Sequence, residues 1–382
     1  MKKILFRKLL HDYIKFFSIA LFCTSIVIWV FQAVNYLDIM IEDGRGYWVY
    51  IKFSLLNFPK IVSKLYPFVL FFSIFYVTVN YELNNELIIY WNFGVHKIQI
   101  VNFIFKFSII LFLIQIILTS IIVPKSQDLA RSFLRTSTVN FFDNFIKPQK
   151  FNDTIKGVTI YTDKKDQNGN LKNLYIKKEI GNKEFQIIYA KQGLFEEKSG
   201  KPILVLYDGA QLTGKNNQIR NFNFSKSDFP LQSLKTNTTT YKKTQEINSL
   251  KLLKCFKNIY LLNGDEGKIR DLKIENCTKK NIENILREVY KRFIIPLYIP
   301  FLSLIPFILI TSSKEDSFYL KIRIFTFLLG LATVIFSETS IRLISKIFSS
   351  NIIFSILPLF LCLITYFVFY KKFNFSYIKN NV

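Results

Sequence analysis

The sequence has little of what metal centres and disulfide-rich folds require. Its 382 residues include 4 cysteines and 2 histidines. None of them forms a Cys-x-x-Cys pair or lies at the spacing of metal ligands. We therefore expect no metal site and no fold that depends mainly on disulfides. The sequence leaves open whether Cys255 and Cys277, both in the polar middle of the chain, are bridged.

Motifs for catalysis and nucleotide binding are also lacking. The chain has no His-Glu-x-x-His or Gly-x-Ser-x-Gly motif, and neither His11 nor His96 is placed to act with a Ser or Cys. The segment Gly209–Asn216 matches a phosphate-binding loop except at its last position, where Asn216 replaces the Ser or Thr that would hold magnesium. We interpret this segment as a hairpin, and we predict no cofactor and no enzymatic activity.

Acidic residues are scarce relative to basic ones. The chain has 27 Asp and Glu against 51 Lys and Arg, which gives a formal charge of +24. Such an excess can indicate nucleic acid or an anionic membrane surface as a partner. The chain is equally rich in the residue types that A/T-rich codons favour, so base composition explains most of the excess. We predict no nucleic-acid partner and keep local basic clusters as candidates for lipid or phosphate contacts.

Long hydrophobic runs are what the sequence has in abundance. Half of the residues are hydrophobic and 17% are aromatic, and the apolar residues are concentrated towards both ends of the chain. A helix needs about 20 mostly apolar residues to cross a bilayer. Six runs meet this requirement: Tyr13–Tyr36, Phe58–Tyr81, Ile98–Val123, Phe293–Ile310, Ile322–Ile341 and Ile352–Tyr370. Glu338 and Arg342, one turn apart in the fifth run, predict a neutralising ion pair, with a functional pair as the alternative.

Basic residues in the short segments between these runs predict the orientation of the chain. They cluster before the first run, between the fourth and fifth runs, and after the sixth. Because short cytoplasmic loops are enriched in Lys and Arg, both termini are expected in the cytoplasm. The domains expected are residues 1–124 with three spans, residues 125–287 as an outer insert, and residues 288–382 with three further spans and a cytoplasmic tail.

The outer insert has the pattern of β-strands. Short runs of alternating apolar and polar residues are separated by turns rich in Asn, Gly and Asp. The clearest runs are residues 158–161, 174–177, 185–189 and 203–207. The insert therefore predicts an antiparallel sandwich or roll, which becomes more helical from about Ser249 to Leu286.

The segment from Tyr81 to Lys97 lies on the expected cytoplasmic side, between the second and third runs. As one amphipathic helix over about residues 82–95, it would place Leu83, Leu87 and Tyr90 on one side and the acids Glu82 and Glu86 on another, with Gly94 as its terminator. Such a helix suits docking into the groove of a partner. A surface helix that only caps the bundle is the alternative, and the pattern alone does not separate the two.

These features together resemble one family, the lipopolysaccharide-export permeases LptF/LptG, over essentially the whole chain. The order of three spans, a β-rich outer domain and three more spans is similar to that family. Local matches are Asn85–Gly94, Pro67, Gly157–Tyr161 and Arg287–Leu297. Between the two members, the N-terminus and the outer domain favour LptF.

The resemblance implies a fold and a function. The fold is an α-helical polytopic membrane protein with six transmembrane helices, arranged 3+3, and an inserted all-β, jelly-roll-like periplasmic domain. The function is that of a bacterial inner-membrane permease subunit of an ABC transporter, which extracts lipopolysaccharide from the outer leaflet and passes it to a periplasmic bridge. The implied partners are a cytoplasmic ATP-binding subunit dimer that hydrolyses the ATP, a second homologous permease, and the bitopic inner-membrane protein of the bridge.

The resemblance also implies roles for particular residues. Glu86, with Glu82 beside it, would engage the ATPase, while Leu87 and Gly94 would shape the coupling helix. Phe93 departs from the family, which usually has a small residue before the terminating Gly.

Basic side chains late in the first span contact lipid A phosphates in the family, but this chain has polar or acidic residues there. That role would pass to the partner permease or to the nearby basic residues Arg45, Lys52, Lys60 and Lys64.

Two other classes of function remain as alternatives. One is a non-transporting ABC-type membrane scaffold, and the other is a membrane-anchored periplasmic binding module. Scaffolds of this kind usually carry the large outer domain after the first span, whereas here it follows the third, which favours export.

Overall fold

The computed structural model describes most of the chain. The described residues are 2–37, 47–136, 146, 148–155, 158–166, 169–181, 184–198, 201–215, 218–230, 242–261, 277–278, 281–312, 314–345 and 348–379. The chain divides into two compact units. The helical unit comprises Met1–Val30, Asn57–Asp128 and Tyr241–Val382, and the β-containing unit comprises Phe31–Leu56 and Leu129–Thr240.

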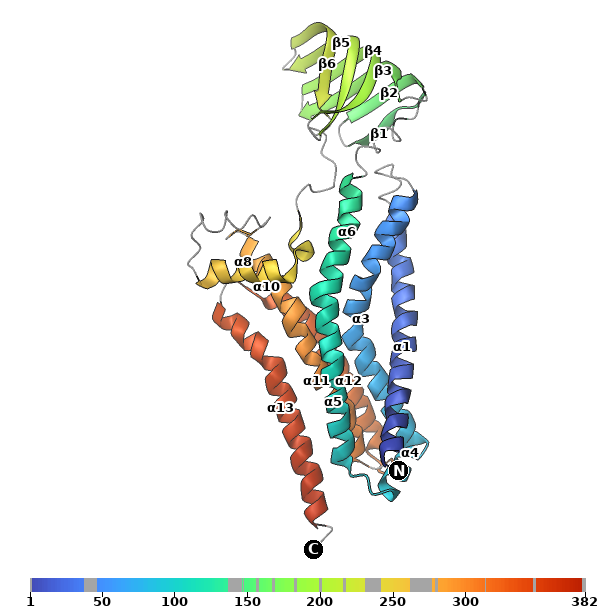
Figure 1. The fold of residues 1–382 in the computed structure, drawn as a ribbon, viewed down its shortest axis with the longest axis vertical. Coiled ribbons are helices and arrows are strands. Elements are labelled where there is room, and N and C mark those ends of the chain that lie inside the picture. The colour runs from blue at the N-terminus through green and yellow to red at the C-terminus, as the bar shows by residue number, and fades with distance from the viewer. Residues whose placement is uncertain are drawn as a thin grey trace. The chain divides into compact units, whose positions relative to one another are not determined.

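The six apolar runs form long helices, as the sequence predicts. Within the described residues, six helical stretches are long and apolar enough to cross a membrane (Figure 1). The first and second are α1 (Lys2–Asn35) and α3 (Tyr47–Leu83); the third joins α5 (Lys97–Ile117), the π-helical turn η1 (Leu118–Ile122) and α6 (Val123–Thr136). The fourth joins α10 (Ile282–Val289), the π-helical turn η5 (Tyr290–Ile294), η6 (Ile295–Leu297), α11 (Tyr298–Leu304) and η7 (Ile305–Thr311). The fifth and sixth are α12 (Tyr319–Leu343) and α13 (Phe348–Lys379).

The fourth stretch is broken into short pieces because of its prolines. Pro296 and Pro306 stand at the starts of η6 and η7. Each lacks the N–H that an α-helix requires, and its ring clashes with the preceding turn. The backbone therefore changes to 3₁₀ geometry at both points, while most of the side chains of this stretch stay buried.

The core of the helical unit is made by α3, α5 and α11, which bury Leu, Ile, Val and aromatic side chains against one another. Gly330 of α12 allows the ring of Phe71 to pack against the helix, where a Cβ would lie 2.0 Å from the ring. By contrast, α1, α12 and α13 expose large apolar side chains such as Phe22 (63%), Phe325 (59%) and Leu363 (67%). Exposed apolar surface of this extent fits lipid or another membrane subunit rather than water.

The outer insert forms one antiparallel sheet of six described strands in the order β1-β2-β3-β4-β5-β6 (Figure 1). The strands are β1 (Asn152–Ile155), β2 (Val158–Lys165), β3 (Leu171–Gly181), β4 (Glu184–Lys198), β5 (Lys201–Lys215) and β6 (Gln218–Pro230). The predicted antiparallel β domain inside a helical membrane protein is therefore confirmed. Alternate residues of β2 to β6, among them Ile160, Leu174 and Leu206, share one buried cluster.

The connectivity of the described strands is a meander. Each strand pairs with its neighbours in sequence, and the pairing Lys198↔Lys201 leaves room for only two residues between β4 and β5. Tight hairpin turns of this length place consecutive strands side by side, whereas a jelly roll needs long crossover connections. The short turns predicted from the sequence agree with this order of the described strands.

The phosphate-loop-like segment is part of this sheet. Gly209 and Gly214 both lie within strand β5 and pair with β4 and β6, so the segment does not form a loop before a helix. A Cβ on Gly209 would lie 2.2 Å from the carbonyl oxygen of Tyr189. The glycine is explained by this close approach of strands, and Asn216 lies outside the described residues.

The segment that follows the sheet is helical, as predicted. It contains η3 (Thr244–Glu246) and α8 (Ser249–Leu261), and α8 packs against α10 through a separate apolar cluster. Cys255 and Cys277 lie in this cluster and form a disulfide, with their Cα atoms 6.0 Å apart. The question that the sequence left open is thus answered by the structure.

Replacing Cys255 and Cys277 together with alanine is expected to lower the free energy of unfolding by about 3 kcal/mol. The bridge joins residues 22 positions apart, and its loss increases the conformational entropy of the unfolded chain. Thermal unfolding in detergent, without reductant, measures the effect. Cys23→Ala, which removes an exposed free thiol, is the matched control, and equal unfolding temperatures of the two variants would contradict the prediction.

Candidate coupling site and buried arginine network

The segment between α3 and α5 forms a short helix of its own, α4 (Glu86–Asn92). Asn85 has a left-handed backbone with φ of 63°, which an α-helix cannot continue through. The chain turns again after α4 at Gly94, whose φ is 68°. The prediction of one helix over residues 82–95 is therefore wrong in extent, because α3 ends at Leu83 and α4 begins only at Glu86.

This break changes which side chains share a face. Leu87 and Tyr90 are buried, at 6% and 2% exposure, but Leu83 is 49% exposed and does not join them. Glu82 belongs to the end of α3 and Glu86 to the start of α4. The two acids are thus not successive positions on one helical face.

The buried side of α4 is held against the first helix. Leu87, Tyr90 and Val95 belong to the same apolar cluster as Leu9 of α1. The Tyr90 hydroxyl donates to the carbonyl oxygen of Leu5 at 2.9 Å. Burial raises the pKa of Tyr90 to about 12, so the phenol stays neutral and keeps this donor.

Two lysines of α1 hold the ends of α4. The Nζ atom of Lys8 lies 2.9 Å from Oε2 of Glu86, and the Nζ atom of Lys2 donates to the carbonyl oxygen of Gly94 at 2.8 Å. Beside them, the Tyr81 hydroxyl donates to the carboxylate of Asp12. Glu86 keeps 27% of its side chain exposed, so it is accessible to another protein as well as paired within the chain.

The outward side of α4 is apolar. Ile88, Ile89 and Phe93 are 49%, 47% and 44% exposed, next to the exposed Leu83. We call Leu83, Glu86, Ile88, Ile89 and Phe93 the coupling patch. Apolar side chains exposed together beside an accessible acid are typical of a protein-binding site.

Glu82 has different surroundings from Glu86. Its charge interacts with those of Lys97 and Lys314, which belong to the start of α5 and to the segment before α12. Lys97 also donates to the carbonyl oxygen of Ile310 at 2.7 Å. Glu82 therefore lies among contacts that connect spans, whereas Glu86 lies on the coupling patch.

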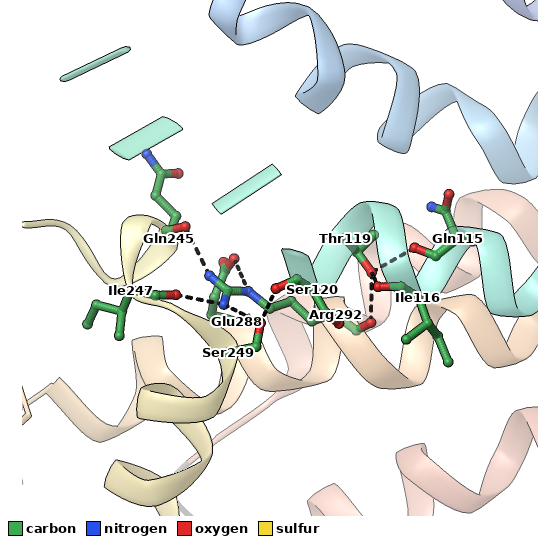
Figure 2. Close-up of polar contacts among 9 residues, drawn as sticks. All are labelled: Gln115, Ile116, Thr119, Ser120, Gln245, Ile247, Ser249, Glu288 and Arg292. Carbon is green, nitrogen blue, oxygen red and sulfur yellow. Dashed lines mark hydrogen bonds and ion pairs between the residues drawn. The ribbon is translucent and has the colours of Figure 1, made fainter. Parts of the chain in front are cut away.

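A second polar site surrounds Arg292, which is 1% exposed. Figure 2 shows its guanidinium between Glu288 and the segment that carries Gln245, Ile247 and Ser249. Its Nε donates to Oε1 of Glu288 at 3.1 Å, and Nη1 donates to the Ile247 carbonyl oxygen and the Ser249 hydroxyl at 2.8 and 2.9 Å. Nη2 donates to the Gln245 carbonyl oxygen at 2.9 Å. A buried guanidinium requires acceptors of this kind for its charge, and these bonds occupy four of its five N–H donors.

The same network reaches the third span. The Thr119 hydroxyl donates to the backbone carbonyl of Arg292 at 2.9 Å, and the Ser249 hydroxyl donates to the carbonyl oxygen of Ser120 (Figure 2). Thr119 and Ser120 lie in η1 and Arg292 lies in η5. Both are π-helical turns, which are often found at functional sites. Arg292 therefore connects the third and fourth spans to the segment that returns from the outer insert.

The anchors of both sites were not predictable from local pattern. Lys8 and Glu86 are 78 positions apart, and Arg292 and Ile247 are 45 apart. The only sequence signal for Arg292 was the group of basic residues at the start of the fourth span.

Comparison with known proteins now identifies the chain. The sequence model of the lipopolysaccharide export system permeases LptF/LptG matches residues 7–372. The chain belongs to the LptF/LptG family. The match does not distinguish LptF from LptG. An uncharacterized protein of Rickettsia prowazekii (strain Madrid E) is 24% identical to the chain over 354 residues, which cover 91% of this chain and 92% of that protein.

Membership in the LptF/LptG family, together with the apolar helices, makes this chain an integral membrane protein and a permease component rather than an enzyme. The lipid-phosphate candidates of this permease are spread along α3. Lys60 and Lys64 are one turn apart on that helix, and Lys52 has its Nζ atom 5.4 Å from the ring centroid of Phe133. Arg45 lies outside the described residues.

The fifth span of the permease differs from one prediction made above. Glu338 and Arg342, both described, form no ion pair within 4.0 Å. Glu338 instead interacts electrostatically with Lys64 of α3 and Lys291 of η5.

Proposed function

We propose that this LptF/LptG permease is a membrane subunit of an ABC transporter that extracts lipopolysaccharide from the outer leaflet of the inner membrane. The observation that carries the proposal is the geometry of α4 in a chain of this family. Its buried side is fixed to α1, and its other side presents the coupling patch outside the apolar part of the spans. A helix with this arrangement suits a partner that pushes on it.

The partners proposed are those of the export system. A cytoplasmic ATP-binding subunit dimer would contact the coupling patch through Glu86, and it would carry out the ATP hydrolysis. A second homologous permease would complete the membrane part, and a bitopic protein would start the periplasmic bridge. Both termini would then lie in the cytoplasm and the β-containing unit, within residues 125–287, in the periplasm.

Transport of such a lipid requires coupled work, since each methylene that leaves the bilayer costs about 0.8 kcal/mol. The contacts of α4 suggest how the work enters the spans. Because Leu87 and Tyr90 pack on α1, and Lys2 and Lys8 hold both ends of α4, α4 would move together with the first helix. Closure of the ATPase dimer would thereby shift the exposed apolar face of α1, such as Phe22 at 63% exposure, against the acyl chains.

The positions of the basic residues support a supplementary role in holding the substrate. Lys60 and Lys64 on α3, with Lys52 and Arg45 earlier in the sequence, are proposed to contact the phosphates of lipid A.

The experiment that tests the function is co-expression with candidate ATPase and permease subunits, purification through this chain in mild detergent, and mass spectrometry of the bound lipid. We expect a complex of two permeases and two ATPase subunits that holds a multi-acylated glycolipid. A complex with an ATPase but without such a lipid would favour the non-transporting scaffold. A lone chain with phospholipid only would favour the membrane-anchored periplasmic binding module.

A further inference from the structure

A cavity of about 290 Å³ lies in the helical unit, beside the arginine network. Its walls come from the end of the third span, from η3 and from the start of α8. They are formed by Ser120, Ile121, Pro124, Lys125, Asp128, Lys242, Glu246, Ile247, Asn248 and Lys251. Half of these lining residues are charged.

Two of the three lysines of this cavity form no ion pair with a described residue. Lys242 pairs with Asp128, whose carboxylate oxygen lies 2.7 Å from its Nζ atom. Glu246 is 3% exposed and accepts the backbone N–H of Lys243 at 3.2 Å. Lys125 and Lys251, both exposed, form no ion pair with any residue that the structure describes. With three lysines against Asp128 and Glu246, the lining of the cavity carries a net charge of +1.

The wall of the cavity is held by hydrogen bonds and contains an unused hydroxyl. Ile247 is fixed by the guanidinium of Arg292, and the neighbouring Ser249 bonds to the carbonyl oxygen of Ser120. Ser120 is 7% exposed, and its hydroxyl has no hydrogen-bond partner among the described residues. Because Ser120 lines the cavity, its hydroxyl has a hydrogen-bonding capacity there that no described residue uses.

The cavity lies at the level where lipid headgroups are expected. The apolar run of the third span ends at Val123, immediately before Pro124 and Lys125. Within the helical unit, α8 runs crosswise to the long helices (Figure 1). It exposes Leu250 at 70% and has an exposed lysine at 251. A helix with exposed leucines and lysines in this orientation is typical of the membrane interface.

We propose that this cavity binds the phosphate group of a membrane lipid. Lys125 and Lys251 approach the phosphate from two elements, and Ser120 donates a hydrogen bond to it. An anion matches the two unpaired cations, and the interfacial position selects a lipid headgroup over a soluble anion. The inference requires only that the spans cross a membrane, and it does not depend on lipopolysaccharide export or on an ATPase.

The test is lipid binding by the full chain in detergent, without ATP. Delipidated protein is titrated separately with phosphatidylglycerol, with lipopolysaccharide and with inorganic phosphate, and bound ligand is counted by native mass spectrometry. The variant is the double substitution Lys125→Gln and Lys251→Gln. The matched control is Lys254→Gln with Lys257→Gln, which removes the same charge from exposed positions of α8 that do not line the cavity.

We expect the cavity variant to bind its lipid at least about tenfold more weakly than the control. The reason is that the cavity variant lacks both lysines that attract the anionic phosphate, whereas the control keeps them. If the cavity variant loses binding of phosphatidylglycerol, the ligand of this cavity is a phospholipid. If it loses binding of lipopolysaccharide alone, the ligand of this cavity is the substrate lipid. Equal binding of each lipid by the cavity variant and the control would overturn the proposal. Binding of inorganic phosphate without either lipid would also overturn it.

Discussion

Glu86→Ala is expected to lower ATP-driven release of lipopolysaccharide by at least about tenfold, since truncating one charge of a hydrogen-bonded interfacial pair costs about 2–5 kcal/mol. The spans are expected to remain folded. The pair with Lys8 is partly exposed, at 27% and 57% of the two side chains, and pairs of this kind contribute less than about 1 kcal/mol to stability. The measurement is release of lipopolysaccharide from proteoliposomes that contain the complete complex, with ATP hydrolysis recorded in parallel.

Lys8→Ala is the matched control for this variant, because it removes the partner of Glu86 within the chain and leaves the acid available to the ATPase. If Glu86 acts mainly on the ATPase, Lys8→Ala loses less of the release activity than Glu86→Ala, because the contacts of Leu87, Tyr90 and Lys2 still hold α4 to α1. Equal losses in both variants would mean that Glu86 only holds α4 to α1, and would contradict the assigned role. The assigned role would also be contradicted if Glu86→Ala bound the ATPase with wild-type affinity and released lipopolysaccharide at the full rate.

The second large effect is expected at Arg292. Arg292→Ala should lower the free energy of unfolding by about 3–5 kcal/mol, the usual cost of removing one partner of a buried charged network. The substitution leaves the carboxylate of Glu288, which is 15% exposed, without its donor. It also removes the donors of the Ile247 and Gln245 carbonyl oxygens and of the Ser249 hydroxyl.

Thermal unfolding in detergent measures this effect, and Arg287→Ala provides the comparison. Arg287 pairs with Glu283 on the same helix, but both side chains are 37% exposed, so its loss is expected to cost less than about 1 kcal/mol. Arg292→Lys should recover only part of the lost free energy of unfolding, because a lysine ammonium cannot reproduce the planar set of donors of a guanidinium. Similar unfolding temperatures for Arg292→Ala and Arg287→Ala would show that the network does not stabilise the fold.

The Arg292 network also bears on how the two sites are related within the helical unit. The coupling patch acts on α1, whereas Arg292 connects η1 and η5 to the segment that returns from the outer insert. A displacement of the third or fourth span would therefore be carried directly to that segment. The disulfide between Cys255 and Cys277 lies in the same region and limits how far α8 can separate from α10.

Much of the architecture followed from local properties of the sequence. Six apolar runs predicted six helices, because a helix needs about 20 mostly apolar residues to cross a bilayer. The alternating runs after residue 150 predicted antiparallel strands. The order of these elements and a few local motifs carried the resemblance to the LptF/LptG family, which the match of the family's sequence model then established. These signals are readable because each depends on residues that are close together in the sequence.

The features that only the tertiary structure determined depend on contacts between residues that are far apart in the sequence. The break at Asn85, the contact of Lys8 with Glu86, and the pairing of Cys255 with Cys277 leave no periodic pattern in the sequence. Arg292 looked like one of several basic residues at a span end, yet packing buries it and gives it four hydrogen bonds to other groups. The hydrophobic pattern of a segment determines which face it buries, but the partner that it meets is set by how the helices pack in space.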